Sequence, residues 1–357
     1  MLLYLLLIVI ILISIILFIK LIRYNDSRII IFYILGLIKN INIHFEKNPI
    51  IIKKILETIS NKGDFIEKMI ALPAWYPIKS LESVNGEEWI EQKKLYIEFI
   101  KHIPSTKLLE EITEEITTKY IYKEIDSYKI AKIVLEIMIK WLFDLNILED
   151  DLNIIVYASI EWKKEIAIKG QGNIKLKYKT IDIINNLINK SKYYDIFKDK
   201  WTDPLYYSII LQPFIISPMI NIPDIAIYIN KYETIDEAIF YHHPFPLLER
   251  YIEKDLYINN ELIIKKNTQV FIPYDTIFKN IDYNKNKTLI FGSGPRKCAG
   301  INYAYGILKP LFKILKNNKN FKPEKNHKYS GRNNDNDTYI FYPLYIVIKL
   351  IINSIYD

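Results

Sequence analysis

The chain contains very little cysteine, and this limits the classes of protein to which it can belong. Cys298 is the only cysteine among 357 residues. A single cysteine excludes an internal disulfide framework, so we expect the folded part to work in a reducing compartment such as the cytosol. The thiol is then free unless it binds something.

Arginine and glycine are also scarce. Isoleucine, lysine, asparagine and tyrosine are abundant throughout, as an AT-rich coding bias would produce, and only five of the 48 basic residues are arginine: Arg23, Arg28, Arg250, Arg296 and Arg332. An arginine retained against such a bias is expected where its planar guanidinium is needed. Three of the ten glycines lie together with the cysteine and Arg296 in FGSGPRKCAG, residues 291–300.

The charge of the chain has no concentrated pattern. The formal net charge is +7, but the lysines are scattered among acidic residues and no stripe of basic and aromatic residues occurs. Such a stripe is what a nucleic-acid-binding surface requires. The sequence therefore predicts no nucleic-acid partner.

One long hydrophobic run stands at the N-terminus. Residues 2–19, LLYLLLIVIILISIILFI, carry no charge and are long enough to span a bilayer at about 1.5 Å per residue. No basic residue precedes the run, and no small-residue cleavage site follows it, which favours an uncleaved anchor over a secretory signal. Lys20, Arg23 and Arg28 follow the run, so residues 1–23 are predicted to be a single-pass anchor of endoplasmic-reticulum type, with the rest facing the cytosol.

The remainder, residues 24–357, is interpreted as one domain. Apolar residues recur at helical spacing in 51–61, 87–103 and 128–145, whereas β-branched and aromatic residues favour strands in 261–272 and 338–352. Residues 150–200 are poorly patterned. The predicted fold class is mainly α with small β-sheets.

The cysteine lies where a loop meets a helix. Gly292, Gly294 and Pro295 interrupt regular structure, and apolar residues at helical spacing follow from Ile301. Backbone N–H groups at a helix entrance stabilise a thiolate, which is a good ligand for a soft metal centre. The alternative, a buried cysteine acting as a small hydrophobe, does not explain the neighbouring residues.

This loop resembles the F-x-x-G-x-R-x-C-x-G signature of the cytochrome P-450 family of haem-thiolate enzymes, with matches at Phe291, Gly294, Arg296, Cys298 and Gly300. Upstream, EAIFYHHPFPLLERYIEKD (237–255) resembles the K helix and the strand after it, and GEEWIEQKK resembles the C helix. The resemblance implies a reduced form of the cytochrome P-450 fold.

The resemblance also implies a cofactor and its ligands. Cys298 would be the axial thiolate ligand of the iron of haem b, and Arg250 and Arg296 would bind the haem propionates. Trp89 and Lys93 would assist from the C helix, although Trp89 alternatively belongs to the core and Lys93 to a solvated helix face. The adjacent histidines 242 and 243 are interpreted as structural.

The sequence departs from the family pattern at several places. Phe240 stands where the K helix normally has the arginine of E-x-x-R, so Glu237 lacks its usual partner, and the segment before the cysteine loop is short. In residues 200–222 no acid precedes a threonine as the family's acid–alcohol pair requires, and Pro204, Pro213 and Pro218 argue against a long, smooth distal helix there. Pro310 is expected to kink or end the last helix.

Three functions remain open at this stage. The first is a membrane-anchored monooxygenase that uses O₂, electrons from a reductase and a small apolar substrate. The second is a haem-thiolate isomerase or reductase that needs no proton relay. The third is a non-catalytic haem-binding protein.

Overall fold

Helices make up most of the chain that this computed structural model describes, namely residues 10–14, 27–65, 81–82, 84–166, 173–245 and 247–323. Side-chain caps mark several helix starts: Asn48, Ser105 and Asp126 each accept a hydrogen bond from a backbone N–H of the following turn. In chain order the helices up to the middle of the chain are α2 (Ser27–Ile38), α3 (Pro49–Thr58), α5 (Gly86–Phe99), α6 (Thr106–Tyr120), α7 (Ser127–Phe143), α8 (Glu149–Ile166), α9 (Ile174–Asn189) and α10 (Lys192–Phe197).

The second half of the chain adds further helices and most of the strands. The helical segments are α11 (Asp203–Tyr206), η1 (Tyr207–Ile216), α12 (Ser217–Ala226), α13 (Ile235–Tyr241), α14 (Tyr274–Ile277), α15 (Tyr283–Asn286), η2 (Lys287–Leu289), η3 (Gly294–Arg296) and α16 (Ile301–Leu315). The strands are β1 (Asn42–Phe45), β2 (Leu248–Ile252), β3 (Leu256–Ile258), β4 (Glu261–Ile264) and β5 (Thr268–Ile272).

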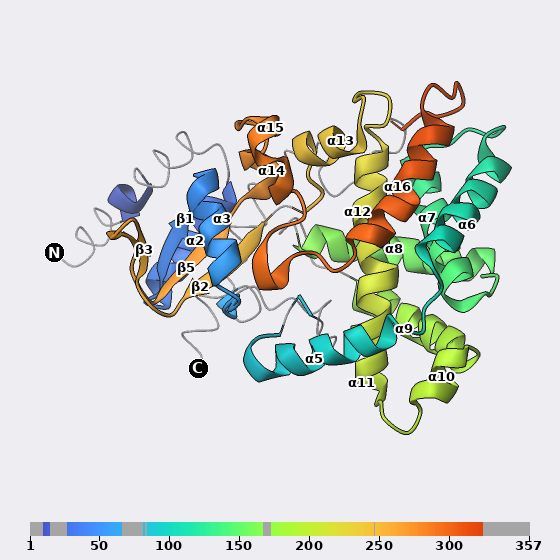
Figure 1. Cartoon of the computed structure of the whole chain (residues 1–357), viewed down its shortest axis with the longest axis horizontal. Helices are drawn as coiled ribbons and strands as arrows, with labels where there is room; N and C mark the ends of the chain where they lie inside the picture. Colours follow the sequence, from blue (N-terminus) through green and yellow to red (C-terminus); the bar gives the residue numbers. More distant parts are fainter. Residues whose placement is uncertain are drawn as a thin grey trace.

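Two small sheets lie at one end of the molecule, beside α2 and α3 (Figure 1). In the first, β5 lies between β1, to which it is parallel, and β2, to which it is antiparallel. The second is the hairpin β3–β4. The predicted strand 261–272 is thus two strands in different sheets, and the break falls at Asn267, which has a φ of 58°.

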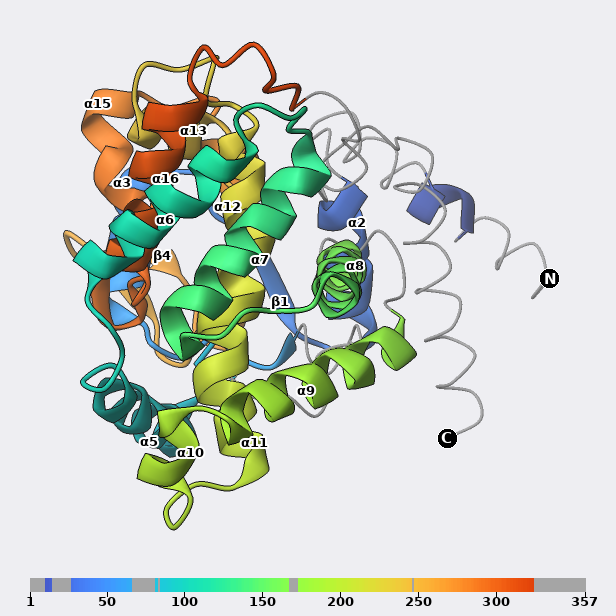
Figure 2. The ribbon, with the colours of Figure 1, turned by 90° about the vertical axis from the view of Figure 1, so that its right-hand side faces the viewer.

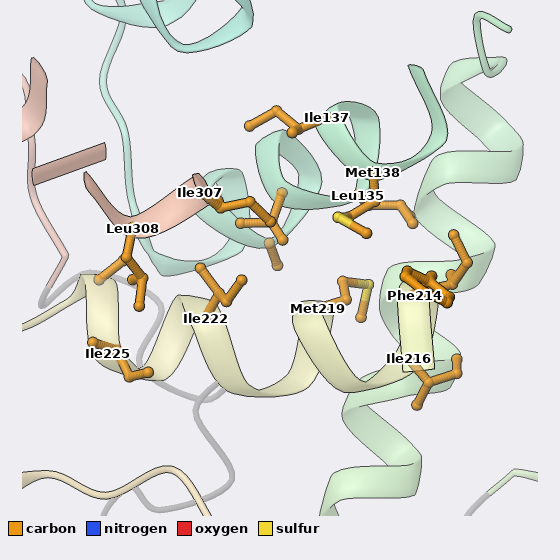
Figure 3. Packing of buried hydrophobic residues seen from close by; sticks show 14 of the residues in the cluster. Leu135, Ile137, Met138, Phe214, Ile216, Met219, Ile222, Ile225, Ile307 and Leu308 are labelled. Carbon is orange, nitrogen blue, oxygen red and sulfur yellow. The ribbon is translucent and has the colours of Figure 1, made fainter. Parts of the chain in front are cut away.

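The helical part is built around the segment α11–η1–α12, which runs without interruption from Asp203 to Ala226. Helix α7 lies beside α12 in both views of the molecule (Figures 1 and 2). Leu135 and Met138 of α7, Met219 and Ile222 of α12, and Ile307 of α16 point into the same layer of side chains (Figure 3). These three helices form the interior against which α6 and α8 pack.

The long segment is a core helix by its burial. Ser208–Ala226 is long and apolar enough to cross a membrane, but 72% of its most apolar window is buried inside the protein. The expectation that Pro204, Pro213 and Pro218 argue against a long, smooth helix is wrong about its length, since the helix is continuous, but the helix is not regular throughout. Residues 207–216 form a π-helix, in which the Ser217 N–H bonds to the Gln212 carbonyl five residues earlier, and this wider turn accommodates the proline ring.

Pro310 likewise does not end or interrupt α16. The helix continues to Leu315 and buries Ile307, Leu308, Leu311 and Leu315 against α6 and α12. Burial of four such side chains outweighs the cost of about 3 kcal/mol that an internal proline imposes.

Other predictions have mixed outcomes. The helices expected at 51–61, 87–103 and 128–145 are present as α3, α5 and α7, each ending two to four residues earlier than expected. The poorly patterned residues 150–200 contain α8, α9 and α10. The strand expected at 338–352 lies outside the described residues, as does most of the N-terminal run, of which residues 10–14 are helical with exposed side chains.

Candidate functional site

The loop before α16 holds Cys298 through its backbone. The Cys298 N–H donates to the Phe291 carbonyl at 2.9 Å, and the Lys297 N–H donates to the Gly294 carbonyl at 3.1 Å. Gly292 and Gly294 have φ values of 72° and 69°, which side chains rarely tolerate. The chain therefore folds back on itself within eight residues and places the cysteine two residues before Gly300, the N-cap of α16.

Gly294 also meets a steric requirement. A Cβ atom there would lie 2.2 Å from the Leu56 carbonyl oxygen and 2.6 Å from the Glu57 Cα, so the loop packs directly on α3. Gly292 has no atom within 4 Å of the corresponding position, so only its backbone conformation favours glycine. The two glycines therefore serve different purposes.

Cys298 is solvent-exposed as a residue, but its sulfur is partly desolvated by the surrounding protein. The side chain is exposed, yet surrounding protein desolvates the sulfur and raises the thiol pKa to about 11, with a smaller contribution from the Glu82 carboxylate. The Gly300 N–H hydrogen-bonds the sulfur and opposes this rise, but desolvation outweighs it. The expected thiolate is therefore a neutral thiol until a metal cation supplies compensating charge.

Arg296 bonds to backbone carbonyls in this structure. Its Nε donates to the Ser60 carbonyl at 2.5 Å and its two terminal nitrogens donate to the carbonyls of Leu81 (3.0 Å) and Val84 (2.7 Å) and to Asn85 Oδ1 (2.9 Å). The guanidinium therefore ties the cysteine loop to the segments before and after residues 66–80.

Trp89 and Lys93 of α5 join Arg296. The Arg296 guanidinium and the Lys93 ammonium each lie 4.7 Å from the Trp89 ring centroid. Lys93 Nζ also donates to the Pro295 carbonyl at 3.1 Å. Three residues that the sequence placed at the site thus meet at the cysteine loop, and Trp89 is half-buried rather than part of the core.

Arg250 lies on β2 and is almost fully buried, at 3% exposure. Its Nε donates to the Ile59 carbonyl at 3.0 Å and its Nη1 to the Glu249 carbonyl at 2.6 Å. The Ser60 carbonyl accepts from Arg296, so two consecutive carbonyls, those of Ile59 and Ser60, accept from Arg250 and Arg296 respectively. Both direct donors at the backbone here, so propionate binding stays a prediction.

Glu237 has a partner other than the missing arginine. Its carboxylate accepts from the backbone N–H of Thr234 at 3.1 Å, while the Thr234 hydroxyl accepts from the Glu237 N–H, which forms a capping box at the start of α13. Phe240 is fully buried, and its ring centroid lies 4.7 Å from that of Phe278 and 5.2 Å from that of Tyr283. Phe240 therefore makes aromatic contacts at the position where the cytochrome P-450 family has the arginine of an ion pair.

The two adjacent histidines have separate surroundings. His243 is buried, and its Nδ1 accepts from the Phe245 N–H at 3.1 Å while its Nε2 donates to the Ile290 carbonyl at 2.8 Å. The ring of His242 stacks on the ring of Tyr228, with 3.5 Å between the ring centroids. Within the described ranges, no three His, Cys, Asp or Glu side chains gather in a way that could hold a metal ion.

Sequence reasoning missed a hydrogen bond between η1 and the segment before α5. Gln212 of η1 donates from Nε2 to Glu82 Oε2 at 3.3 Å, and Glu82 is the acidic group whose charge acts on the Cys298 thiol. The Ser217 hydroxyl, farther along the same helical segment, accepts from Asn221 Nδ2 at 3.2 Å. The available signal was the single amide in the apolar stretch SIILQPFII.

Comparison with known proteins supports the fold. No protein-family model matches the chain, and no curated protein matches it. Solved structures do match: CYP175A1 from Thermus thermophilus has 12% sequence identity and a TM-score of 0.55, covering 76% of this chain and 80% of that one. CYP154A1 from Streptomyces coelicolor has 11% identity and a TM-score of 0.55, covering 75% and 82%.

A third match is P450BioI in complex with an acyl carrier protein ligated to hexadec-9Z-enoic acid, with 13% identity, a TM-score of 0.58, and coverage of 83% of this chain and 91% of that one. These neighbours define a class of helix-rich folds with small sheets. The chain has the cytochrome P450 fold.

Proposed function

We propose that the chain is a haem-thiolate oxidoreductase in which Cys298 is the axial ligand of haem b iron. The observation that carries the proposal is the position of the only cysteine, in a tight loop before α16 of a cytochrome P450 fold. The accessible sulfur, which accepts the Gly300 N–H, suits a metal ligand.

The residues around the sulfur fit this cofactor in part. The haem would be held by Cys298, with Phe291, Gly294 and Gly300 shaping the loop. Trp89, Lys93 and Arg296 would supply an aromatic ring and positive charge at the loop, and Arg250, held by the Ile59 carbonyl, would supply a second guanidinium. For either arginine to bind a propionate, it must release a carbonyl that it holds here. When bound, the haem supplies oxygen activation, which the electron-donating thiolate favours.

Monooxygenation is the proposed reaction, with O₂, a small apolar substrate and a reductase as electron donor. Complex formation of P450BioI with a fatty-acyl carrier protein supports the apolar substrate class. In the described helix Asp203–Ala226 no acid is followed by a threonine or serine, and this favours, as a second candidate, an isomerase or reductase reaction that needs no proton relay. Non-catalytic haem binding is a third.

These candidates differ in how turnover is driven. If monooxygenation proceeds without a good relay, added peroxide should support it relatively better than the reductase does, because peroxide brings its own electrons and protons. The measurement compares product formed per O₂ or peroxide consumed, using a substrate that shifts the haem spin state. Tightly coupled reductase turnover would show that an efficient relay exists.

Membrane attachment is proposed from residues 2–19 and the basic residues that follow them. The protein should remain in the pellet after alkaline carbonate extraction. An acceptor site for glycosylation engineered near residue 320 should stay unmodified, because the domain faces the cytosol. Release by carbonate or modification of that site would contradict the proposal.

The decisive experiment on the cofactor is the absorption spectrum of the reduced, carbon monoxide-bound protein. The parent should show the thiolate-type spectrum and Cys298→Ala should lose it. Ser293→Ala is the matched control in the same loop, since Ser293 bonds only peripherally to Glu57 at 3.3 Å, and it should retain the spectrum. A Cys298→Ala protein with the parent spectrum would refute the ligand assignment.

A further inference from the structure

Residues 59–63, directly after α3, bind other segments of the protein through five consecutive backbone carbonyls. The carbonyls of Ile59, Ser60, Asn61, Lys62 and Gly63 accept, in that order, from Arg250 Nε, Arg296 Nε, the Tyr251 N–H, Gln269 Nε2 and Asn85 Nδ2, at distances of 2.5–3.0 Å. We call this segment the strap. Both arginines that are proposed to bind haem propionates are among its partners, so the strap restrains their guanidinium groups.

Asn85 joins the strap to Arg296 through both ends of its side-chain amide. Its Nδ2 donates to the Gly63 carbonyl at 2.8 Å, and its Oδ1 accepts from the Lys62 N–H and from Arg296 Nη2, both at 2.9 Å. The two bonds to the strap determine which end of the amide is oxygen, because the reverse orientation would bring the amide NH₂ group against the Lys62 N–H. The amide oxygen has two acceptor lone pairs, and Arg296 uses the one that Lys62 leaves.

The helix that Asn85 precedes does not explain this side chain. Asn85 is the N-cap residue of α5, where an asparagine commonly accepts from a backbone N–H of the first turn. Asn48 and Asn173 make this bond at the starts of α3 and α9. In α5, which is described throughout, the Asn85 side chain makes no such bond. Its hydrogen bonds go to the strap and to Arg296 instead.

Asn85 holds part of the Arg296 guanidinium in place. Arg296 Nη2 donates to Asn85 Oδ1 and, at 2.7 Å, to the Val84 carbonyl, while Nε donates to the Ser60 carbonyl. Because the guanidinium is planar, fixing these two nitrogens fixes the plane of the group, whose central carbon lies 4.7 Å from the Trp89 ring centroid. Asn85 contributes a side-chain acceptor, so a substitution can remove this bond without changing the backbone.

We propose that Asn85 is a positioning residue for Arg296. Its amide, oriented by the strap, holds the guanidinium over Trp89 while a carboxylate of the cofactor replaces one of the backbone carbonyls that Arg296 binds. Asn85 acts through Arg296 and not on the cofactor itself. Without Asn85 the positive charge of Arg296 remains but its orientation is lost, and the cofactor is held less firmly. The inference rests on the proposed function.

The first test measures the surroundings of Trp89 in the haem-free full chain, labelled with 5-fluorotryptophan. The fluorine resonance that Trp89→Phe lacks belongs to Trp89. Asn85→Ala should shift this resonance, because the Arg296 guanidinium moves over the ring. In an Arg296→Lys background, which has no Nη2, Asn85→Ala should cause no further shift. The same shift in both backgrounds would overturn the inference, since Asn85 would then act on Trp89 directly.

The matched control is Asn61→Ala. Asn61 is also a half-buried asparagine, lies in the strap, and bonds through its side chain to Glu253 Oε1 at 3.0 Å and to the Gly63 N–H at 2.8 Å. Neither of these bonds reaches Arg296. Asn61→Ala should therefore leave the Trp89 resonance at its parent position, and a shift equal to that of Asn85→Ala would contradict a specific role for Asn85.

The second test measures the rate at which the haem-loaded full chain transfers haem to an acceptor protein. Asn85→Ala should release haem about fivefold faster than the parent, the effect expected for the loss of one hydrogen bond. Asn61→Ala should change the rate less than about twofold. In the Arg296→Lys background, Asn85→Ala should also change it less than about twofold. An equal acceleration in both backgrounds would show a general structural role and refute the proposal.

The two tests separate the inference from the proposed function. If the parent lacks the thiolate-type spectrum, the proposed function fails, and the fluorine measurement still decides whether Asn85 orients Arg296. If Arg296→Lys retains no haem, the same measurement on the haem-free chain decides the question.

Discussion

Replacing Phe240 by arginine would restore the family's E-x-x-R pattern, and the structure indicates that this change destabilises the protein. Phe240 is fully buried and contacts the rings of Tyr241, Phe278 and Tyr283 at 5.3, 4.7 and 5.2 Å. Removing a phenylalanine from such a site costs about 3–5 kcal/mol. An arginine there can reach the carboxylate of Glu237, three residues earlier, only by taking it from the capping box, which costs about 1 kcal/mol more.

We therefore expect Phe240→Arg to lower the free energy of unfolding by at least about 3 kcal/mol and to release haem faster than the parent. The measurement is urea unfolding followed by tryptophan fluorescence, together with the rate of haem transfer to an acceptor protein.

Phe240→Leu is the control for a change of shape without charge, and it should lose less stability, about 1 kcal/mol. A Phe240→Arg protein as stable as the parent, or one that holds haem longer, would refute the reasoning, because it would show that an ionic network can form at α13.

Further predictions concern the cysteine loop, a helix cap and acid stability. Gly294→Ala should lose about 3 kcal/mol by urea unfolding because its Cβ meets backbone atoms of α3, whereas Gly292→Ala should lose about 1 kcal/mol from backbone strain alone; equal losses would contradict this. Thr234→Ala should lose about 1 kcal/mol in the same assay, since it removes half of the capping box, and no loss would mean that Glu237 is held otherwise. For Glu46, burial raises the carboxyl pKa, but bonds from His44 and from the N–H groups of Asn48 and Lys47 outweigh burial and leave the pKa below 4.5. The stabilisation by the ionised Glu46 carboxylate is complete above its pKa in the unfolded chain and is lost as the pH falls through its lowered pKa in the folded protein. The stability difference between the parent and Glu46→Gln should therefore shrink as the solution is acidified; a difference that grows would contradict this prediction.

Several features of the candidate site could be predicted because they are local in the chain. The glycines, Arg296 and Cys298 lie within ten residues, and the backbone conformations at Gly292 and Gly294 are those that favour glycine. Trp89 and Lys93 are one helical turn apart, which puts both on one face of α5, where they meet the loop. Helix α7 was predictable because its caps and its apolar residues agree.

Other features depend on contacts between distant segments and were therefore missed. The bond between Glu82 and Gln212 joins residues 130 apart, and nothing near either residue specifies the other. The prolines of the long segment argued against a helix, since an internal proline costs about 3 kcal/mol. Packing of that segment against α7 and α16 offsets this cost, and the π-turn relieves the clash.

Helices with strong apolar periodicity, the tight loop around Cys298 and the glycines that this loop requires could be predicted from the chain alone, because local backbone preferences and spacing depend on adjacent residues. The folded structure was needed to see that Glu237 caps α13, that Phe240 completes an aromatic cluster, and that Gln212 of η1 bonds to Glu82. The physical reason is that burial and hydrogen-bond satisfaction are properties of the whole packed interior, and they override local propensities wherever enough apolar surface is buried.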